Sequence, residues 1–219
     1  MGYLDKAQAH YEEAIRRFRQ QNNLIGETYN LGNLGWLLIH KGALEQTDSL
    51  LTEATDNARK MGDKLYLSTV LSHWVECKQK QNHIQEALNL CKEALVIAQE
   101  TKDQMNLAIG FAKLRSLHLK LGELVKARST LKESIEAAIA TQDMPLMLSV
   151  LIAYAEHLLI DDKEQASNLL KFIIHHEGTA HYVRKEANTL LKLLDQEPSA
   201  SLSNRLSLAD WIEKASSFC

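Results

Sequence analysis

Residues 122–138 read Gly-Glu-Leu-Val-Lys-Ala-Arg-Ser-Thr-Leu-Lys-Glu-Ser-Ile-Glu-Ala-Ala, and this pattern recurs along the chain. Steps of forty residues toward the N-terminus reach similar segments that begin at Asn82, Gly42 and Gly2, and one step of thirty-nine toward the C-terminus reaches Asp161. A fixed period of this size indicates a solenoid, in which each unit buries its apolar face only against its neighbours. The repeat therefore decides the fold class.

The second half of each repeat places a small, a large and a small residue at spacings of four and three, which puts them on one face of an α-helix. The five sets are Ala7/Tyr11/Ala14, Thr47/Leu51/Ala54, Ala87/Cys91/Ala94, Ala127/Leu131/Ser134 and Ala166/Leu170/Ile173, of which only the last ends in a large residue. The chain also has only two prolines in 219 residues, which favours helices. We expect an all-α solenoid of antiparallel helix pairs.

Short Asx side chains recur before each first helix of a pair, at Asn23, Asp63, Asp103 and Asp143. Such side chains accept hydrogen bonds from the free N–H groups of a first helical turn, so we predict that these are N-caps. The array is expected over residues 1–176, with a partial repeat at 2–25 and further repeats at about 26–65, 66–105, 106–145 and 146–176. Residues 177–197 are expected to form a capping helix, and 198–219 a linker and a short terminal amphipathic helix.

The first helix of each pair carries large residues that we expect to pack between the two helices, and Gly35 marks a place where two backbones approach closely. The predicted core positions are Leu31/Leu34/Leu38, Leu71/Trp74/Val75, Phe111/Leu114/Arg115 and Leu151/Tyr154/Ala155/Leu158. Lys113, beside Leu114, is then expected on a solvated helix face.

The order of these residues resembles the tetratricopeptide repeat (TPR), whose consensus positions are occupied by Leu31, Leu34, Gly35, Gly42, Thr47, Leu51 and Ala54. Thr47 replaces the consensus alanine, and Arg115 replaces the consensus glycine. The period exceeds the usual one of about 34 residues, which is similar to the long-helix variant of bacterial regulators. The resemblance implies a right-handed superhelix with a concave groove.

The C-terminal part, with its His181-Tyr-Val-Arg-Lys-Glu-Ala187 helix and Asp210-Trp-Ile212 segment, resembles the carboxy-terminal sensor region of bacterial signal-transducing ATPases and transcriptional activators. The first helix lacks the partner that would complete its repeat. We therefore expect the chain to be a fragment of a longer protein, the alternative being a natural start at Met1.

The composition excludes several classes of protein. A net charge of −3 with interspersed acidic and basic residues argues against direct binding to nucleic acid. No apolar run is long enough to span a membrane, and three cysteines without metal-ligand spacing favour a cytoplasmic location. No phosphate loop or nucleophile elbow is present. We therefore expect no catalytic residues, no metal and no cofactor.

Trp36 follows Gly35 on the side of its helix that lines the concave groove in TPR arrays, where an exposed aromatic side chain can anchor a partner. The alternative is that Trp36 packs on the partial repeat, whereas Trp74 is expected in the core. Polar residues occupy equivalent groove positions. Each one taken singly is better explained as part of a solvated helix face, but as a row around Trp36 they form the best candidate surface: Tyr29, Asn33, His40, His73, Glu76, Lys113, Ser116, Lys120 and Glu156.

We expect a non-catalytic module that binds a protein or peptide in this groove, as the sensor region of a larger regulator. A small effector is an alternative ligand, and a second copy could pair with the exposed first face. The chaperone-tail clamp of two lysines and two asparagines is not reproduced, because Gly32 and Trp36 stand where its first Lys and Asn would be. Two alternatives remain, a stand-alone regulator that binds a signalling peptide and, less favoured, an enzyme built on helical hairpins.

Overall fold

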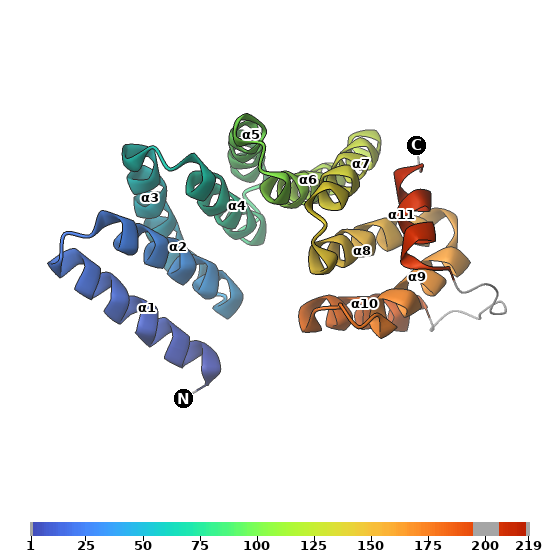
Figure 1. Ribbon diagram of the computed structural model, residues 1–219, viewed down its shortest axis with the longest axis horizontal. Coiled ribbons are helices and arrows are strands. Elements are labelled where there is room, and N and C mark those ends of the chain that lie inside the picture. The colour runs from blue at the N-terminus through green and yellow to red at the C-terminus, as the bar shows by residue number, and fades with distance from the viewer. Residues whose placement is uncertain (1, 195–205, 218–219) are drawn as a thin grey trace. The chain divides into compact units, whose positions relative to one another are not determined.

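The computed structural model describes residues 2–194 and 206–217, which form eleven α-helices and no strand. The end of the expected capping helix at 195–197, the expected linker that begins at residue 198, and Cys219 lie outside this part of the chain. The helices divide into two compact units, residues 1–122 and 123–219. The first unit (Figure 1) contains α1 (Tyr3–Gln20), α2 (Leu24–Lys41), α3 (Leu44–Met61), α4 (Lys64–Lys80), α5 (Ile84–Thr101) and α6 (Gln104–Lys120).

Each helix of the first unit packs on the next one along the chain. In addition, α2 contacts α4 and α4 contacts α6, so the first helices of successive pairs form one continuous layer. This sequential packing confirms the expected α-solenoid. Because α2, α4 and α6 approach one another, their shared face is the inner side of the first unit.

The predicted N-caps are confirmed. The side chains of Asn23, Asp63, Asp103 and Asp143 accept hydrogen bonds from the backbone N–H groups of Gly26, Tyr66, Asn106 and Leu146. Each helix before these caps ends on a residue with positive φ, and such residues recur every twenty positions: Asn22, Gly42, Gly62, Asn82, Lys102, Gly122 and Gln142. A left-handed residue is a common helix stop, so local residues set the end of one helix and the start of the next at the turns that precede α2, α4, α6 and α8.

Gly35 allows α2 and α3 to approach closely, as its position in the repeat predicted. A Cβ atom added to Gly35 would lie 2.5 Å from Cδ2 and 3.0 Å from Cγ of Leu51. Leu51 is fully buried in the core that also contains Leu31, Leu34 and Val70. The side chain of Leu51 therefore occupies the space that the missing Cβ leaves.

We expect Gly35→Ala to lower the free energy of unfolding by about 1–3 kcal/mol, because the added methyl group overpacks this contact. The better helix propensity of alanine offsets part of this cost. Urea denaturation followed by circular dichroism measures the change. In a Leu51→Ala background the same substitution should be neutral or stabilising, and equal costs in both backgrounds would contradict the close contact.

The core of the first unit differs from the prediction at its last helix. Leu71 and Val75 are fully buried, but Phe111 and Leu114 on α6 are only partly buried. Both residues lie on the predicted side of α6. However, α6 is the last helix of this unit, and no further helix of the unit covers these two side chains. Arg115, which stands at the consensus glycine position, is itself buried.

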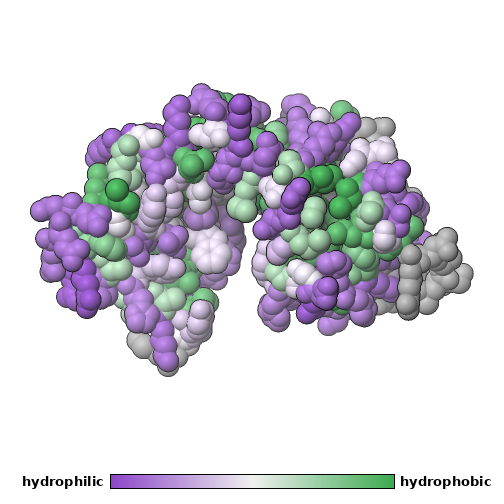
Figure 2. All heavy atoms as spheres, in the orientation of Figure 1, coloured by the Kyte–Doolittle hydropathy of each residue, from purple (hydrophilic) through white to green (hydrophobic). Residues whose placement is uncertain are grey.

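The second unit contains α7 (Leu124–Thr141), α8 (Met144–Asp161), α9 (Lys163–His175), α10 (His181–Leu194) and α11 (Leu208–Ser216). Pro145 lies in the first turn of α8, where its missing N–H group leaves no hydrogen bond unmade. Helix α10 packs on α8 and α9, with Val183 and Ala187 fully buried, and it thereby covers the last pair. On the face drawn in Figure 2, hydrophilic side chains cover most of the first unit, and hydrophobic ones gather over the middle of the second.

Helix α11 packs against α7. Its Trp211 is only 1% exposed, and Ile212 lines a small apolar pocket together with residues of α7 and α8. The Lys214 ammonium group donates a hydrogen bond of 3.1 Å to the Gln165 side chain on α9. The terminal segment is thus an integral part of the second unit. Among the helices of residues 2–194 and 206–217, none is long and apolar enough to cross a membrane.

Candidate binding groove

The inner side of the first unit repeats five positions on three helices, and we call these residues the groove face. They are Ile25, Tyr29, Asn33, Trp36 and His40 on α2; Leu65, Thr69, His73, Glu76 and Lys80 on α4; and Met105, Ile109, Lys113, Ser116 and Lys120 on α6. Spacings of four and three residues keep each set on one side of its helix. Contacts between neighbouring helices, described below, link the three sets.

Trp36 is an exposed aromatic residue within the groove face. Its side chain remains 43% exposed, while its ring lies 4.3 Å from that of His40 and 6.4 Å from that of His73, measured between centroids. The Nδ1 atom of His40 lies 2.9 Å from the carbonyl oxygen of Trp36. The two histidines therefore border an indole ring that is fixed on one side and open on the other.

His73 lies in the layer between α2 and α4. Burial lowers the pKa of His73 to about 4, with a further contribution from the charge of Lys113, while a hydrogen bond with the Gly32 backbone and the charge of Glu76 oppose the shift. The Nδ1 atom of His73 is buried and has no hydrogen-bond partner. The imidazole is neutral at pH 7.

Glu76 and Lys113 join α4 to α6. The Lys113 ammonium group lies 3.4 Å from one Glu76 carboxylate oxygen, and Lys80 lies 3.5 Å from the other. Burial would raise the pKa of Glu76, but Lys113 and other neighbouring cations lower it overall. Burial lowers the pKa of Lys113 against the opposing effect of Glu76. Lys113 is only 18% exposed, so the expectation of a solvated face at this position is wrong.

Tyr29 forms the aromatic part of the groove face nearest the N-terminal end of α2. Its hydroxyl group donates a hydrogen bond of 2.7 Å to Asp63, and its ring lies 4.1 Å from that of Tyr66. The Tyr66 hydroxyl group in turn donates to the carbonyl oxygen of Tyr29 at 2.9 Å. These contacts fix Tyr29 against α4 while 39% of it stays exposed.

Two lysines at the C-terminal ends of α4 and α6 repeat one contact. Lys80 donates to the carbonyl oxygen of Ile39 at 3.3 Å, and Lys120 donates to that of Gln79 at 3.2 Å. Each ammonium group therefore satisfies a carbonyl in the last turn of the preceding inner helix, where a cation is also favoured by the helix dipole.

The remaining predicted residues have less defined places. Asn33 and Ser116 lie on the groove face and are partly buried. Glu156 lies on α8 in the second unit, where it is partly buried. The structure therefore brings together the predicted residues of α2, α4 and α6, whereas Glu156 belongs to a separate compact unit.

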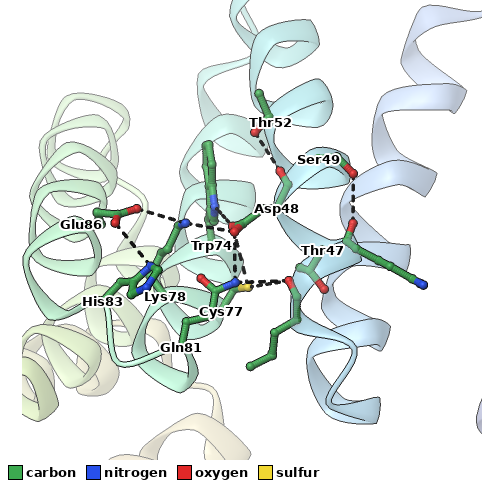
Figure 3. Close-up of polar contacts among 12 residues, drawn as sticks. Thr47, Asp48, Ser49, Thr52, Trp74, Cys77, Lys78, Gln81, His83 and Glu86 are labelled. Carbon is green, nitrogen blue, oxygen red and sulfur yellow. Dashed lines mark hydrogen bonds and ion pairs between the residues drawn. The ribbon is translucent and has the colours of Figure 1, made fainter.

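A polar cluster around Asp48 was not predicted from the sequence. In Figure 3, three side chains from the end of α4 converge on the Asp48 carboxylate of α3. The Trp74 indole N–H donates at 2.7 Å, and the Lys78 ammonium and Gln81 amide groups each donate at 3.0 Å. Lys78 also lies 3.1 Å from Glu86 of α5, so the cluster ties three consecutive helices together.

The Asp48 carboxylate is held in its charged form. Burial would raise its pKa, but hydrogen bonds from Gln81, Trp74 and Lys78 lower the pKa overall. The predicted core position of Trp74 is correct in part, because the ring is partly buried against the core and its N–H group bonds to Asp48. No repeat signal marks this cluster, since the positions equivalent to Asp48 are Gln8, Leu88 and Arg128.

The carboxylates and thiols described for the first unit are paired or buried. Asp48 and Glu76 each lie against a lysine, and burial raises the pKa of the Cys77 thiol to about 11 and that of the Cys91 thiol to about 12. Within residues 2–194 and 206–217, no group of His, Cys, Asp and Glu side chains is arranged to hold a metal ion. The exposed Trp36 ring and its polar neighbours make the groove face a candidate surface for binding.

Comparisons with known proteins agree with the fold. The chain is similar to the crystal structure of BtubC (BKLC) from P. vanneervenii, with a TM-score of 0.66, 14% sequence identity and coverage of 95% of this chain and 99% of that one. At this identity the likeness concerns the fold alone. None of the curated proteins matches the sequence.

The model of one protein family, described as anaphase-promoting complex subunit 5, matches three overlapping segments, residues 2–81, 74–116 and 109–162. Successive matches to one model are what an array of similar helix pairs produces. These matches confirm the TPR type at the level of the fold, and they cover well over half of the 219 residues. The chain therefore belongs to the anaphase-promoting complex subunit 5 family, a TPR-like family of helical repeats.

Proposed function

We propose that the chain is a non-catalytic protein-binding module that receives a peptide segment of its partner on the groove face of the first unit. A helical repeat scaffold fits an interaction role. The choice of the groove face rests chiefly on one observation, the exposed Trp36 ring bordered by His40 and His73. Aromatic side chains in preformed polar surroundings are typical binding hot spots.

The surroundings of Trp36 support this proposal because they are rigid before any partner arrives. Hydrogen bonds and ion pairs fix Tyr29, Glu76 and Lys113 to a neighbouring inner helix. A partner that binds to side chains already held in place loses less conformational entropy on binding. The polar groups around Trp36 thus set an orientation, while the indole ring supplies apolar contact area.

The wider context is also a proposal. The family description names a subunit of a multi-protein complex, which supports a scaffold role within an assembly. The resemblance of the C-terminal part to sensor regions of bacterial regulators supports a second context, in which the module is the interaction end of a longer signalling protein in the cytoplasm. The identity of the captured partner distinguishes the two contexts.

We expect Trp36→Ala to weaken partner binding about tenfold or more, because it removes the exposed anchor. The melting temperature should change little, since the ring is already partly solvated. Partners are captured from cell extract on the wild-type chain, identified by mass spectrometry and then titrated as purified proteins against both variants.

Tyr182→Ala is the matched control, because Tyr182 is an aromatic residue of α10 that is 62% exposed and lies in the second unit. A partner that binds wild type and Trp36→Ala equally well would show that the groove face is not the site. Glu76→Lys is a less informative variant, because it sets a second ammonium group beside the buried Lys113 and thereby destabilises the first unit.

A further inference from the structure

We propose that the groove face recognises a short partner segment that is apolar at one end and acidic at the other, bound along the axes of the inner helices. This inference rests on the proposed function and specifies the chemistry of its ligand. It follows from how the side chains of the groove face change along α2, α4 and α6. They are apolar where these helices begin and basic where they end.

The apolar end consists of Ile25, Leu65 and Met105, which occupy one position in three successive repeats. These side chains are 59%, 55% and 47% exposed. A single exposed apolar residue is ordinary, but apolar residues in adjacent repeats form a patch that favours contact with another apolar surface. One turn further along, Ile109 and the exposed Tyr29 extend this end of the groove face.

The basic end is formed by His40, Lys80 and Lys120, which are all exposed and again occupy one repeat position. The two ammonium groups are anchored by the carbonyl oxygens of Ile39 and Gln79. A lysine has three donors, so Lys80, which also lies 3.5 Å from Glu76, and Lys120 each keep at least one donor for a carboxylate of the partner. These are cations held in place, which a partner does not have to order on binding.

The charges of the groove face favour an acidic partner. Among its residues the lysines are Lys80, Lys113 and Lys120, whereas Glu76 supplies the one carboxylate. Glu76 is already engaged by Lys113 and Lys80. A basic segment would therefore meet like charges at the ends of α4 and α6, whereas carboxylates would meet complementary ones.

The distance between the apolar end and the basic end of the groove face matches the length of a short peptide. From Leu65 to Lys80 on α4 is fifteen residues, which corresponds to about 22 Å along a helix axis. An extended peptide covers this distance with about seven residues. The apolar and acidic ends of such a segment are thus expected to be separated by about four to six residues.

The test uses a displayed library of random twelve-residue peptides, selected on the complete chain and counter-selected on Trp36→Ala. We expect the selected peptides to carry apolar residues near one end and Asp or Glu near the other. Synthetic labelled peptides are then titrated by fluorescence anisotropy. The Lys80→Glu/Lys120→Glu variant should bind them at least tenfold more weakly, and Leu65→Ser should also weaken binding.

The matched control is Lys60→Glu/Lys92→Glu, because these lysines are exposed on the outer helices α3 and α5, and it should bind as wild type does. Peptides that depend on Trp36 but show no acidic end, or tolerate the charge reversal at Lys80 and Lys120, would overturn this inference and leave the proposed function standing. A library that yields no peptide dependent on Trp36 would overturn both.

Discussion

Replacing Trp211 by alanine is expected to lower the free energy of unfolding of the second unit by about 3–5 kcal/mol, the range observed when large aromatic side chains are removed from a core. Trp211 is the largest side chain among those that are almost completely buried, and α11 is a helix of only nine residues. A helix this short has few other side chains that could hold it against α7 once the indole ring is removed. Urea denaturation measures the stability, and amide hydrogen exchange reports whether α11 detaches from α7.

Trp211→Phe is the informative control. The indole N–H of Trp211 is buried without a hydrogen-bond partner, and an unsatisfied buried donor lowers stability. Phenylalanine keeps most of the apolar volume and removes this donor, so we expect a loss below about 1.5 kcal/mol. If alanine and phenylalanine cost the same, or if alanine costs less than about 1 kcal/mol, α11 is not held by this side chain.

The features that could be predicted from the sequence are those that the repeat and local chemistry determine. Asn23 and Asp63 cap helices because a short side chain meets free N–H groups three residues later, which needs no knowledge of the tertiary structure. Gly35 was placed at a close approach because the repeat pattern fixes the phase of its helix. The same repeat pattern predicts that Trp36, His73 and Lys113 lie on one side of the first helices of their pairs.

What could not be predicted depends on neighbours that are remote in sequence. Lys113 was expected in solvent because the repeat pattern places it on the side of α6 that faces the groove. In the structure, however, Glu76 and the adjacent helix α4 largely bury it. The Asp48 cluster has no counterpart in other repeats, so periodicity carries no signal for it. The amphipathic pattern around Trp211 predicts a helix, but not which surface covers its apolar face.

Acidification from pH 7 to pH 5 is expected to lower the free energy of unfolding of the first unit by about 2 kcal/mol through His73. The pKa of His73 falls from 6.5 to about 4 on folding, chiefly because the ring is buried. The unfolded chain therefore binds a proton below pH 6.5 that the folded chain does not bind until about pH 4. Stability is complete above the unfolded pKa and is lost as the pH falls toward the folded one.

His73→Gln isolates this contribution, because the glutamine side chain is polar and of similar length but does not titrate in this range. The pH dependence of urea denaturation between pH 7 and pH 5 should be shallower in the variant by about the same 2 kcal/mol. The charges that face His73 are Lys113, Glu76 and His40, and all three are unchanged in the variant. Parallel pH profiles for the two proteins would mean that the pKa of His73 does not change on folding, so that the imidazole in the groove face is protonated below about pH 6.5.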